Sequence, residues 1–328
     1  MDYDFVSFGD ITTDCFIKLK EARVTCDLND ENCMLCVRFG QKIPYESAAE
    51  IRSVGNGPNA AVSAHRLGLK SAIVTNLGDD ENGEHCLKAL QKERISTEFV
   101  RVHKGSRTNY HYVLQYESER TILIKHEEYK YELPAFGKAP RWIYLTSLSK
   151  TSLKYQLAIA GYVHRNNVRL AFQPGTFQME LGTKALAPVY LATEIFFCNK
   201  EEAQKILETK EVDLKKLLSG IRALGPKIAV ITDGPKGAYI MDDSGAYSAP
   251  MYPDPMPPIN RTGAGDATSS TTVAYMMMGM TPQESLLRGI INASDVVQHV
   301  GAQAGLLSKA KIEKFYQNRP PEFKISAL

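Results

Sequence analysis

Short apolar stretches alternate with amphipathic segments along most of the chain. The first stretch, Tyr3–Phe8, is followed by Gly9-Asp10, and buried strands commonly end this way at the ligand-binding edge of an α/β sheet. From Pro58 onward, strand and helix patterns alternate regularly. This order predicts a mostly parallel sheet with helices on both faces, that is, a three-layer α/β/α core.

The individual elements can be assigned from these patterns. Further strands are expected at Ala72–Asn76, Trp142–Thr146, Arg169–Phe172, Ile195–Cys198, Ile228–Thr232, Ala238–Met241 and Ala246–Ala249. Helices are expected at Pro58–Leu67, Gly83–Glu93, Tyr155–His164, Glu201–Leu207, Asp213–Leu224, Gly263–Met278, Pro282–Val300 and Lys309–Tyr316.

Two regions, residues 12–54 and 97–127, interrupt this order. Their strand patterns alternate apolar and polar residues, which is typical of a sheet with one solvent-facing side. These strands are Cys15–Leu19, Ile43–Arg52, Glu98–Val102, Tyr110–Tyr116 and Arg120–His126. We therefore expect residues 1–11, 55–96 and 128–328 to form the core, and the two interrupting regions to form a small β-lid.

Charge and composition narrow the function classes. Lys and Arg number 39 against 37 Asp and Glu, so the net charge of +2 argues against a protein specialised for nucleic acid or membrane surfaces. The first residues lack the basic and apolar regions of a signal peptide. We expect a cytoplasmic protein, with its six cysteines reduced.

Three of these cysteines, Cys26, Cys33 and Cys36, lie close together inside the proposed lid. Their thiolates could hold zinc together with Cys15 or a histidine. A second Cys-x-x-Cys pair is missing, which favours unbonded thiols or a packing role instead.

The segment Asn260-Arg261-Thr262-Gly263-Ala264-Gly265-Asp266 carries the strongest chemical signal. It leads into a predicted helix, whose first backbone N–H groups are unpaired and lie at the positive end of the helix dipole. Gly263 and Gly265 would let a phosphate approach the backbone closely, while the carboxylate of Asp266 suits a hydroxyl whose proton it could accept. The alternative is a tight turn with Asp266 as an ordinary N-terminal helix charge.

Other motifs accompany this segment in order along the chain: Gly9-Asp10-Ile11-Thr12-Thr13-Asp14, Gly55-Asn56-Gly57-Pro58-Asn59, Arg66-Leu67-Gly68, Asn199-Lys200-Glu201-Glu202, Thr232-Asp233-Gly234-Pro235-Lys236-Gly237 and Gly301-Ala302-Gln303. With Thr262-Gly263-Ala264-Gly265-Asp266, this series resembles the ribokinase (PfkB) family of carbohydrate and nucleoside kinases. The resemblance spans Gly9 to Gly301 and implies a ribokinase-like fold.

The resemblance also implies roles for individual residues. Asp266 would be the general base beside an anion hole formed by Gly263, Ala264 and Gly265. The acceptor would be held by Asp14, Gly55, Asn56 and Asn59. ATP and Mg²⁺ would be bound near Asn199, Glu202, Thr232, Gly234, Gly237, Asn292 and Gln303, with Glu202 reaching the metal through water.

Three positions depart from the family pattern. Val54 replaces the first glycine of one signature, so the backbone there should avoid positive φ. Asn260 replaces an aspartate that helps to bind a monovalent cation in the ribokinase branch, which makes K⁺ activation doubtful, and the phosphosugar branch often carries asparagine there. Arg261 could reach a phosphate or could simply be solvated.

The sequence therefore predicts an ATP-dependent kinase that phosphorylates a primary hydroxyl of a small carbohydrate. A phosphosugar or a nucleoside remains possible as acceptor, and Tyr110 or Tyr112 could stack on a base. A non-catalytic ligand-binding protein of the same fold is the rival from another class. A dinucleotide-dependent oxidoreductase is disfavoured because no G-x-G-x-x-G follows the first strand. The segment after Arg169–Phe172, beginning with Gln173, could border the site. The lid could also pair with a second copy, which predicts a homodimer.

Overall fold

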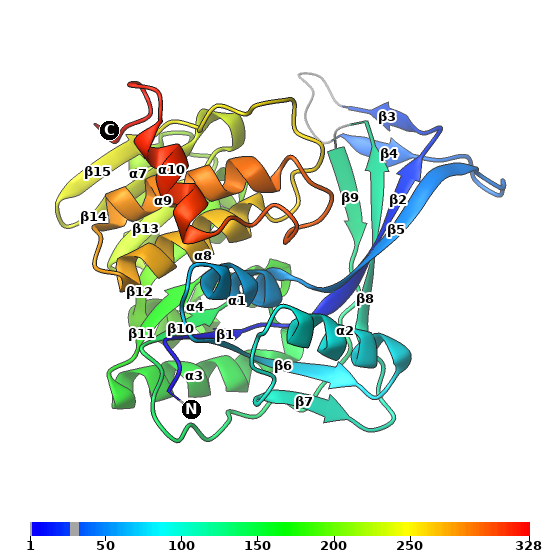
Figure 1. Ribbon diagram of the computed structural model, residues 1–328, viewed down its shortest axis with the longest axis horizontal. Coiled ribbons are helices and arrows are strands. Elements are labelled where there is room, and N and C mark those ends of the chain that lie inside the picture. The colour runs from blue at the N-terminus through cyan, green and yellow to red at the C-terminus, as the bar shows by residue number, and fades with distance from the viewer. Residues whose placement is uncertain (1, 27–32, 118) are drawn as a thin grey trace.

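The computed structural model describes residues 2–26, 33–117 and 119–328 (Figure 1). Its main sheet has ten strands in the order β16-β15-β14-β13-β12-β11-β10-β1-β6-β7. The strands are β1 (Phe5–Phe8), β6 (Ser71–Gly78), β7 (Val100–His103), β10 (Trp142–Leu145), β11 (Arg169–Phe172), β12 (Thr193–Asn199), β13 (Ile228–Thr232), β14 (Ala238–Asp242), β15 (Gly245–Ala249) and β16 (Ser326–Ala327). Neighbours from β7 to β13 pair in parallel, and β14, β15 and β16 add an antiparallel edge.

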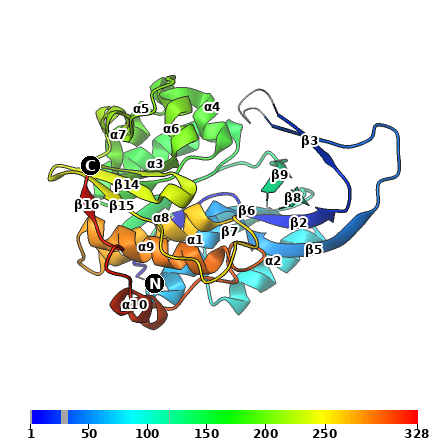
Figure 2. The same ribbon diagram turned by 90° about the horizontal axis from the view of Figure 1, so that it is seen from above.

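Helices cover both faces of this sheet, as predicted (Figures 1 and 2). One face is packed by α1 (Asn56–Arg66), α8 (Ala264–Met277), α9 (Pro282–Val296) and α10 (Lys309–Gln317). The opposite face is packed by α3 (Leu153–Asn166), α4 (Thr176–Ala185), α5 (Ala187–Ala192), α6 (Lys200–Ile206) and α7 (Leu214–Ala223). Along β1, Phe5 packs on the face covered by α8 and Val6 packs on the face covered by α3, because successive side chains of a strand point to opposite faces.

The lid is a separate four-stranded sheet in the order β5-β2-β8-β9. It consists of β2 (Thr12–Leu19), β5 (Tyr45–Val54), β8 (Asn109–Tyr116) and β9 (Glu119–Leu123), and α2 (Glu81–Lys92) packs against β5 and β2. The strand predicted at Glu98–Val102 corresponds to β7, but it does not belong to the lid sheet as expected. It pairs with β6 at the edge of the main sheet. An edge strand is half solvated, so its alternating pattern resembled that of a lid strand.

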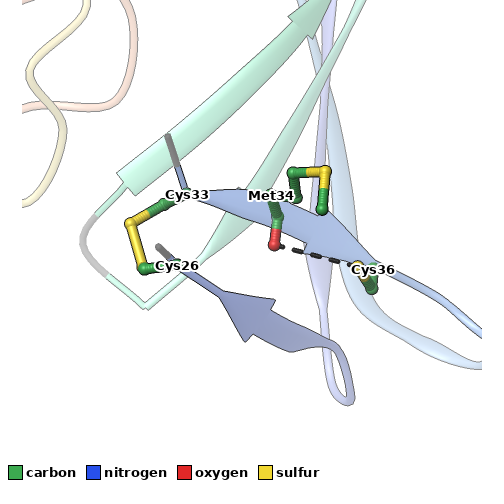
Figure 3. Close-up of a disulfide and its surroundings, with 4 residues drawn as sticks. All are labelled: Cys26, Cys33, Met34 and Cys36. Carbon is green, nitrogen blue, oxygen red and sulfur yellow. Dashed lines mark hydrogen bonds between the residues drawn. A yellow bond between two sulfur atoms is a disulfide. The ribbon is translucent and has the colours of Figure 1, made fainter. Parts of the chain in front are cut away.

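A hairpin of β3 (Arg23–Thr25) and β4 (Met34–Cys36) extends from the far end of the lid (Figure 1). Cys26 and Cys33 form a disulfide across it, with an S–S distance of 2.01 Å (Figure 3). The expectation that all six cysteines are reduced is therefore wrong for this pair. Cys36 is a free thiol whose Sγ lies 3.9 Å from the carbonyl oxygen of Met34. The disulfide was not predicted from the sequence, because the cysteine spacing was considered as a possible zinc site and the thiols were otherwise expected to be reduced.

Among the helices of residues 2–26, 33–117 and 119–328, none is both long enough and apolar enough to cross a bilayer.

Candidate active site

Asp266 lies in the first turn of α8, where the sequence places the candidate anion hole. Gly263 precedes the helix in a left-handed conformation, with φ of 85°. A Cβ at this position would come within 2.3 Å of the Cβ of Ala302, so only glycine lets the two loops approach this closely. The turn thus orients the first amides of α8 and the carboxylate of Asp266 toward one region.

Three side-chain amides surround the Asp266 carboxylate. Asn56 Nδ2 donates to Oδ1 at 2.8 Å, Asn59 Nδ2 donates to Oδ2 at 2.7 Å, and Gln173 Nε2 donates to Oδ1 at 3.0 Å. Burial raises the pKa of Asp266, and the three amide bonds act in the opposite direction because they favour the ionised form. The amides therefore hold a buried carboxylate in a defined orientation.

The backbone at the start of α1 positions two of these amides, those of Asn56 and Asn59, against Asp266. Gly55 has φ of 106° and directly precedes α1, and its missing Cβ leaves room for the carbonyl oxygen of Asp10. Asn56 and Asn59 then lie one turn apart and face the same neighbour. Val54 ends β5 without positive φ, as the departure from the family pattern led us to expect, and the positive φ of 61° at the preceding Ser53 was not predicted.

Unpaired donors lie near the start of α8. The Nε atoms of Arg120 and Arg261 and the hydroxyl of Thr262 are buried and have no hydrogen-bond partner among the described residues. Burial lowers the pKa of Arg120, and Arg261 adds to this effect, whereas Glu119 and Asp266 oppose it. Arg261 Nε lies 3.9 Å from Glu119 Oε1, a loose ion pair with a largely exposed carboxylate, so the two guanidinium groups still suit an anionic ligand.

Asp14, which the sequence predicts to hold the acceptor, lies on β2 at the junction of lid and core. Its Oδ1 is 3.4 Å from Nδ1 of His111 on β8. This geometry is too poor to count as a hydrogen bond, and Asp14 Oδ1 and His111 Nε2 are both buried without a partner. Beside them, Asp10 accepts a hydrogen bond from Tyr131 at 2.8 Å and contacts His126 Nδ1 at 2.8 Å, which ties the segment after β9 to the core.

On the predicted nucleotide side, Asn199 and Glu202 form a capping box at the start of α6. Asn199 Oδ1 accepts from the Glu202 amide at 2.8 Å, and Glu202 Oε2 accepts from the Asn199 amide at 2.8 Å. Burial raises the pKa of Glu202, and the nearby Asp266 adds to this effect. The Glu202 carboxylate therefore lies within electrostatic range of Asp266.

Other predicted nucleotide residues fall into two groups. Thr232 ends β13, and Gly234 and Gly237 belong to the tight turn that follows, where Gly237 has φ of 92°. Asn292 is fully buried and bonds to Thr271 and to the Leu307 amide, while Gln303 donates to Asn59 Oδ1 at 3.0 Å. The side chains of Asn292 and Gln303 thus bind other parts of the protein, and Gln303 contacts Asn59, one of the residues predicted to hold the acceptor.

Several residues of this site were not identified as functional from the sequence. Gln173, Arg120 and His111 each belong to unremarkable strand contexts, and only long-range packing brings them to the site. The position of Gln173, directly after a buried parallel strand, was the one available signal.

A cavity of about 350 Å³ lies elsewhere in the protein. It is lined by residues including Thr75, Arg101 and Glu132 and contains none of the predicted site residues.

Across residues 2–26, 33–117 and 119–328, no three His, Cys, Asp or Glu side chains come close enough together to hold a metal ion directly.

Comparison with known proteins agrees with this arrangement. The pfkB family of carbohydrate kinases matches residues 17–309. The chain is 25% identical to ribokinase from Mus musculus over 266 residues, which cover 76% of this chain and 80% of the relative. It is also 25% identical to ATP-dependent 6-phosphofructokinase from Thermoanaerobacterium thermosaccharolyticum over 277 residues, covering 80% and 84% of the two chains.

A solved structure shares the fold. Arabidopsis thaliana ribokinase complexed with ribose and ATP superimposes with a TM-score of 0.78 at 18% identity, covering 96% of this chain and 98% of that one. The family match extends over nearly the whole chain, including the lid, α1 and the α8 turn. This protein therefore belongs to the PfkB family of carbohydrate kinases and is a phosphotransferase with an alcohol acceptor.

Proposed function

We propose that the protein transfers the γ-phosphoryl group of ATP to a primary hydroxyl of a small sugar, with Asp266 as general base. The observation that carries this proposal is the buried Asp266 carboxylate at the N-terminal turn of α8, held by three amide donors. A fixed carboxylate beside helix amides combines proton acceptance with stabilisation of a transferring phosphoryl group.

In this mechanism the acceptor hydroxyl gives its proton to Asp266 as its oxygen bonds to the γ-phosphorus. The bond from that phosphorus to the β,γ-bridging oxygen breaks, and ADP leaves with the electron pair. The amides of Gly263, Ala264 and Gly265 face the developing charge. Arg120 and Arg261 supply cationic groups whose Nε atoms have no hydrogen-bond partner among the described residues, which supports a phosphate there.

Asp14 holds the acceptor from the lid side. Its carboxylate is largely buried and has no hydrogen bond to the described residues, so it can accept two sugar hydroxyls. Asn56 and Asn59 connect this side to the base. The lid excludes water, which would otherwise compete as phosphoryl acceptor.

Glu202 fits the expected magnesium ion as a ligand acting through water. Its Oε2 is used by the Asn199 amide, which leaves Oε1 free for a hydrated cation. Held there, Mg²⁺ would supply positive charge that neutralises the phosphates of ATP. Asn199 orients Glu202 through the capping box.

A phosphosugar acceptor is the second candidate, and the cationic side chains of Arg120 and Arg261 favour it. Guanidinium groups recognise phosphate through paired, directional hydrogen bonds. The similarity to a 6-phosphofructokinase supports the same reading. A free sugar would leave these arginines to the nucleotide alone.

The test is ADP release with ATP and Mg²⁺ in the presence of D-ribose, D-fructose, D-fructose 6-phosphate or adenosine. One of the sugars should give turnover, and Asp266→Asn should lower kcat about 10²- to 10⁴-fold while ATP binding persists. Asp243→Asn, whose carboxylate is almost fully exposed, is the control and should leave kcat unchanged. Full turnover by Asp266→Asn would refute the base assignment, and turnover of adenosine alone would refute a sugar acceptor.

A further inference from the structure

We propose that Gln173 is a positioning residue that assigns different tasks to the two oxygens of Asp266. It occupies Oδ1 and leaves Oδ2 to receive the proton of the acceptor. This inference rests on the proposed function, because it concerns how the same general base is prepared.

The hydrogen bonds of the carboxylate are unevenly distributed. Oδ1 accepts from Asn56 at 2.8 Å and from Gln173 at 3.0 Å, whereas Oδ2 accepts from Asn59 at 2.7 Å and from no other described residue. An ionised carboxylate has about four lone-pair positions, two on each oxygen. Three are filled by amides, so the one that remains is on Oδ2, and the acceptor hydroxyl should donate there.

The orientation of the Gln173 amide is fixed from behind. Its Oε1 accepts from Ser269 Oγ at 2.8 Å and from the Tyr144 hydroxyl, and the two hydroxyls lie 2.6 Å apart. A reversed amide would place its carbonyl oxygen against the Asp266 carboxylate, which is electrostatically unfavourable. The NH₂ group therefore faces Asp266.

The residues behind Gln173 are parts of the rigid core. Tyr144 belongs to β10 and is fully buried, and Ser269 lies one turn after Asp266 on α8 and also bonds to the Gly265 carbonyl at 2.7 Å. Gln173 thus links the central sheet to the helix that carries the base. Asn59 is held similarly by Gln303. Both links reduce the freedom of the carboxylate before the acceptor arrives.

The hydrogen bond from Gln173 also affects the pKa of Asp266. An N–H donor stabilises the ionised carboxylate more than the neutral acid, so the Gln173 bond lowers the pKa of Asp266 against the raising effect of burial. The other charged or titratable groups whose fields reach Asp266 are Arg120, Glu202 and Tyr144. Removing the Gln173 donor leaves these groups in place and should let Asp266 protonate at higher pH.

The direct test follows the ¹³Cγ resonance of Asp266 in protein labelled at aspartate, and Asp266→Asn identifies the signal. Gln173→Leu should move the titration midpoint to higher pH, and Tyr144→Phe should move it less in the same direction. Gln204→Leu is the matched control, because its amide bonds to the Glu211 carbonyl, and it should not move the midpoint. If Gln173→Leu folds poorly, Tyr144→Phe alone decides.

The kinetic test uses the most active of the four acceptors named above. Gln173→Leu should lower kcat about tenfold or more and shift the acidic limb of its pH profile upward, with KM for ATP nearly unchanged. An unchanged midpoint in both Gln173→Leu and Tyr144→Phe would overturn the positioning role. Loss of the base assignment is a different result, since it would appear as full turnover by Asp266→Asn.

Discussion

The half of the site built on the core and the half built on the lid differ in how completely their polar groups are paired. On the core side, Asp266 is bonded to three amides, and two of these, on Asn59 and Gln173, are fixed by further partners. On the lid side, Asp14 Oδ1, His111 Nε2 and Arg120 Nε are buried without a partner.

This difference separates two tasks. A group that acts in the transition state is most effective when it is already oriented, because no reorganisation is then needed during the reaction. An unpaired buried polar group costs about 1–3 kcal/mol, and a ligand that pairs with it recovers this energy on binding. The core half is thus prepared for chemistry, and the lid half is prepared for selective recognition.

The largest effect in the lid half is expected from Asp14. Asp14→Ala removes a charged acceptor of two sugar hydroxyls, each bond being worth about 1.5–3 kcal/mol, and should lower kcat/KM for the sugar at least 100-fold. KM for ATP should change little, and Asp2→Asn at an exposed position is the control. A decrease of less than threefold would mean that Asp14 does not contact the acceptor.

A smaller effect is expected from Arg120, and it also separates two sources of phosphate. Arg120→Met should lower kcat/KM about tenfold or more. A loss confined to D-fructose 6-phosphate would assign the guanidinium to the acceptor's own phosphate, and an equal loss with every acceptor would assign it to the transferring group. Arg101→Met, which breaks an ion pair with Glu132 outside the site, is the control. No loss with any acceptor would contradict an anionic ligand at Arg120.

Much of the core half could be predicted from the sequence, because its determinants are local. The Gly263–Asp266 turn needs a left-handed glycine and a helix start, and both can be read from adjacent residues. The central parallel strands are short, mostly buried apolar runs, and β11 and β13 coincide with their predicted bounds. Asn199 and Glu202 were likewise picked out by the motif Asn199-Lys200-Glu201-Glu202, which forms a capping box at the start of α6.

The rest depended on contacts between distant parts of the chain. Gln173 meets Asp266 across 93 positions, and nothing in its neighbourhood specifies that partner. The placement of β7 in the main sheet depends on its pairing with β6, which a one-sided alternating pattern does not reveal. The Cys26–Cys33 disulfide requires the β3–β4 hairpin, whose strands are too short for their pattern to be recognised.

The smallest effect is expected at that hairpin, which tests whether the whole lid or only its base belongs to the site. The hairpin projects away from α8 (Figures 1 and 2), and its Val24 and Met34 are about half exposed or more, at 48% and 62%. Cys26→Ser/Cys33→Ser should therefore leave kcat/KM within about twofold and the unfolding midpoint within about 2 °C. Cys198→Ser, at a buried core position, is the contrasting variant and should lower the midpoint more. A fivefold loss of kcat/KM in the double variant would extend the recognition half of the site to the tip of the lid, because the closing motion would then depend on a segment that contacts neither Asp14 nor Asp266.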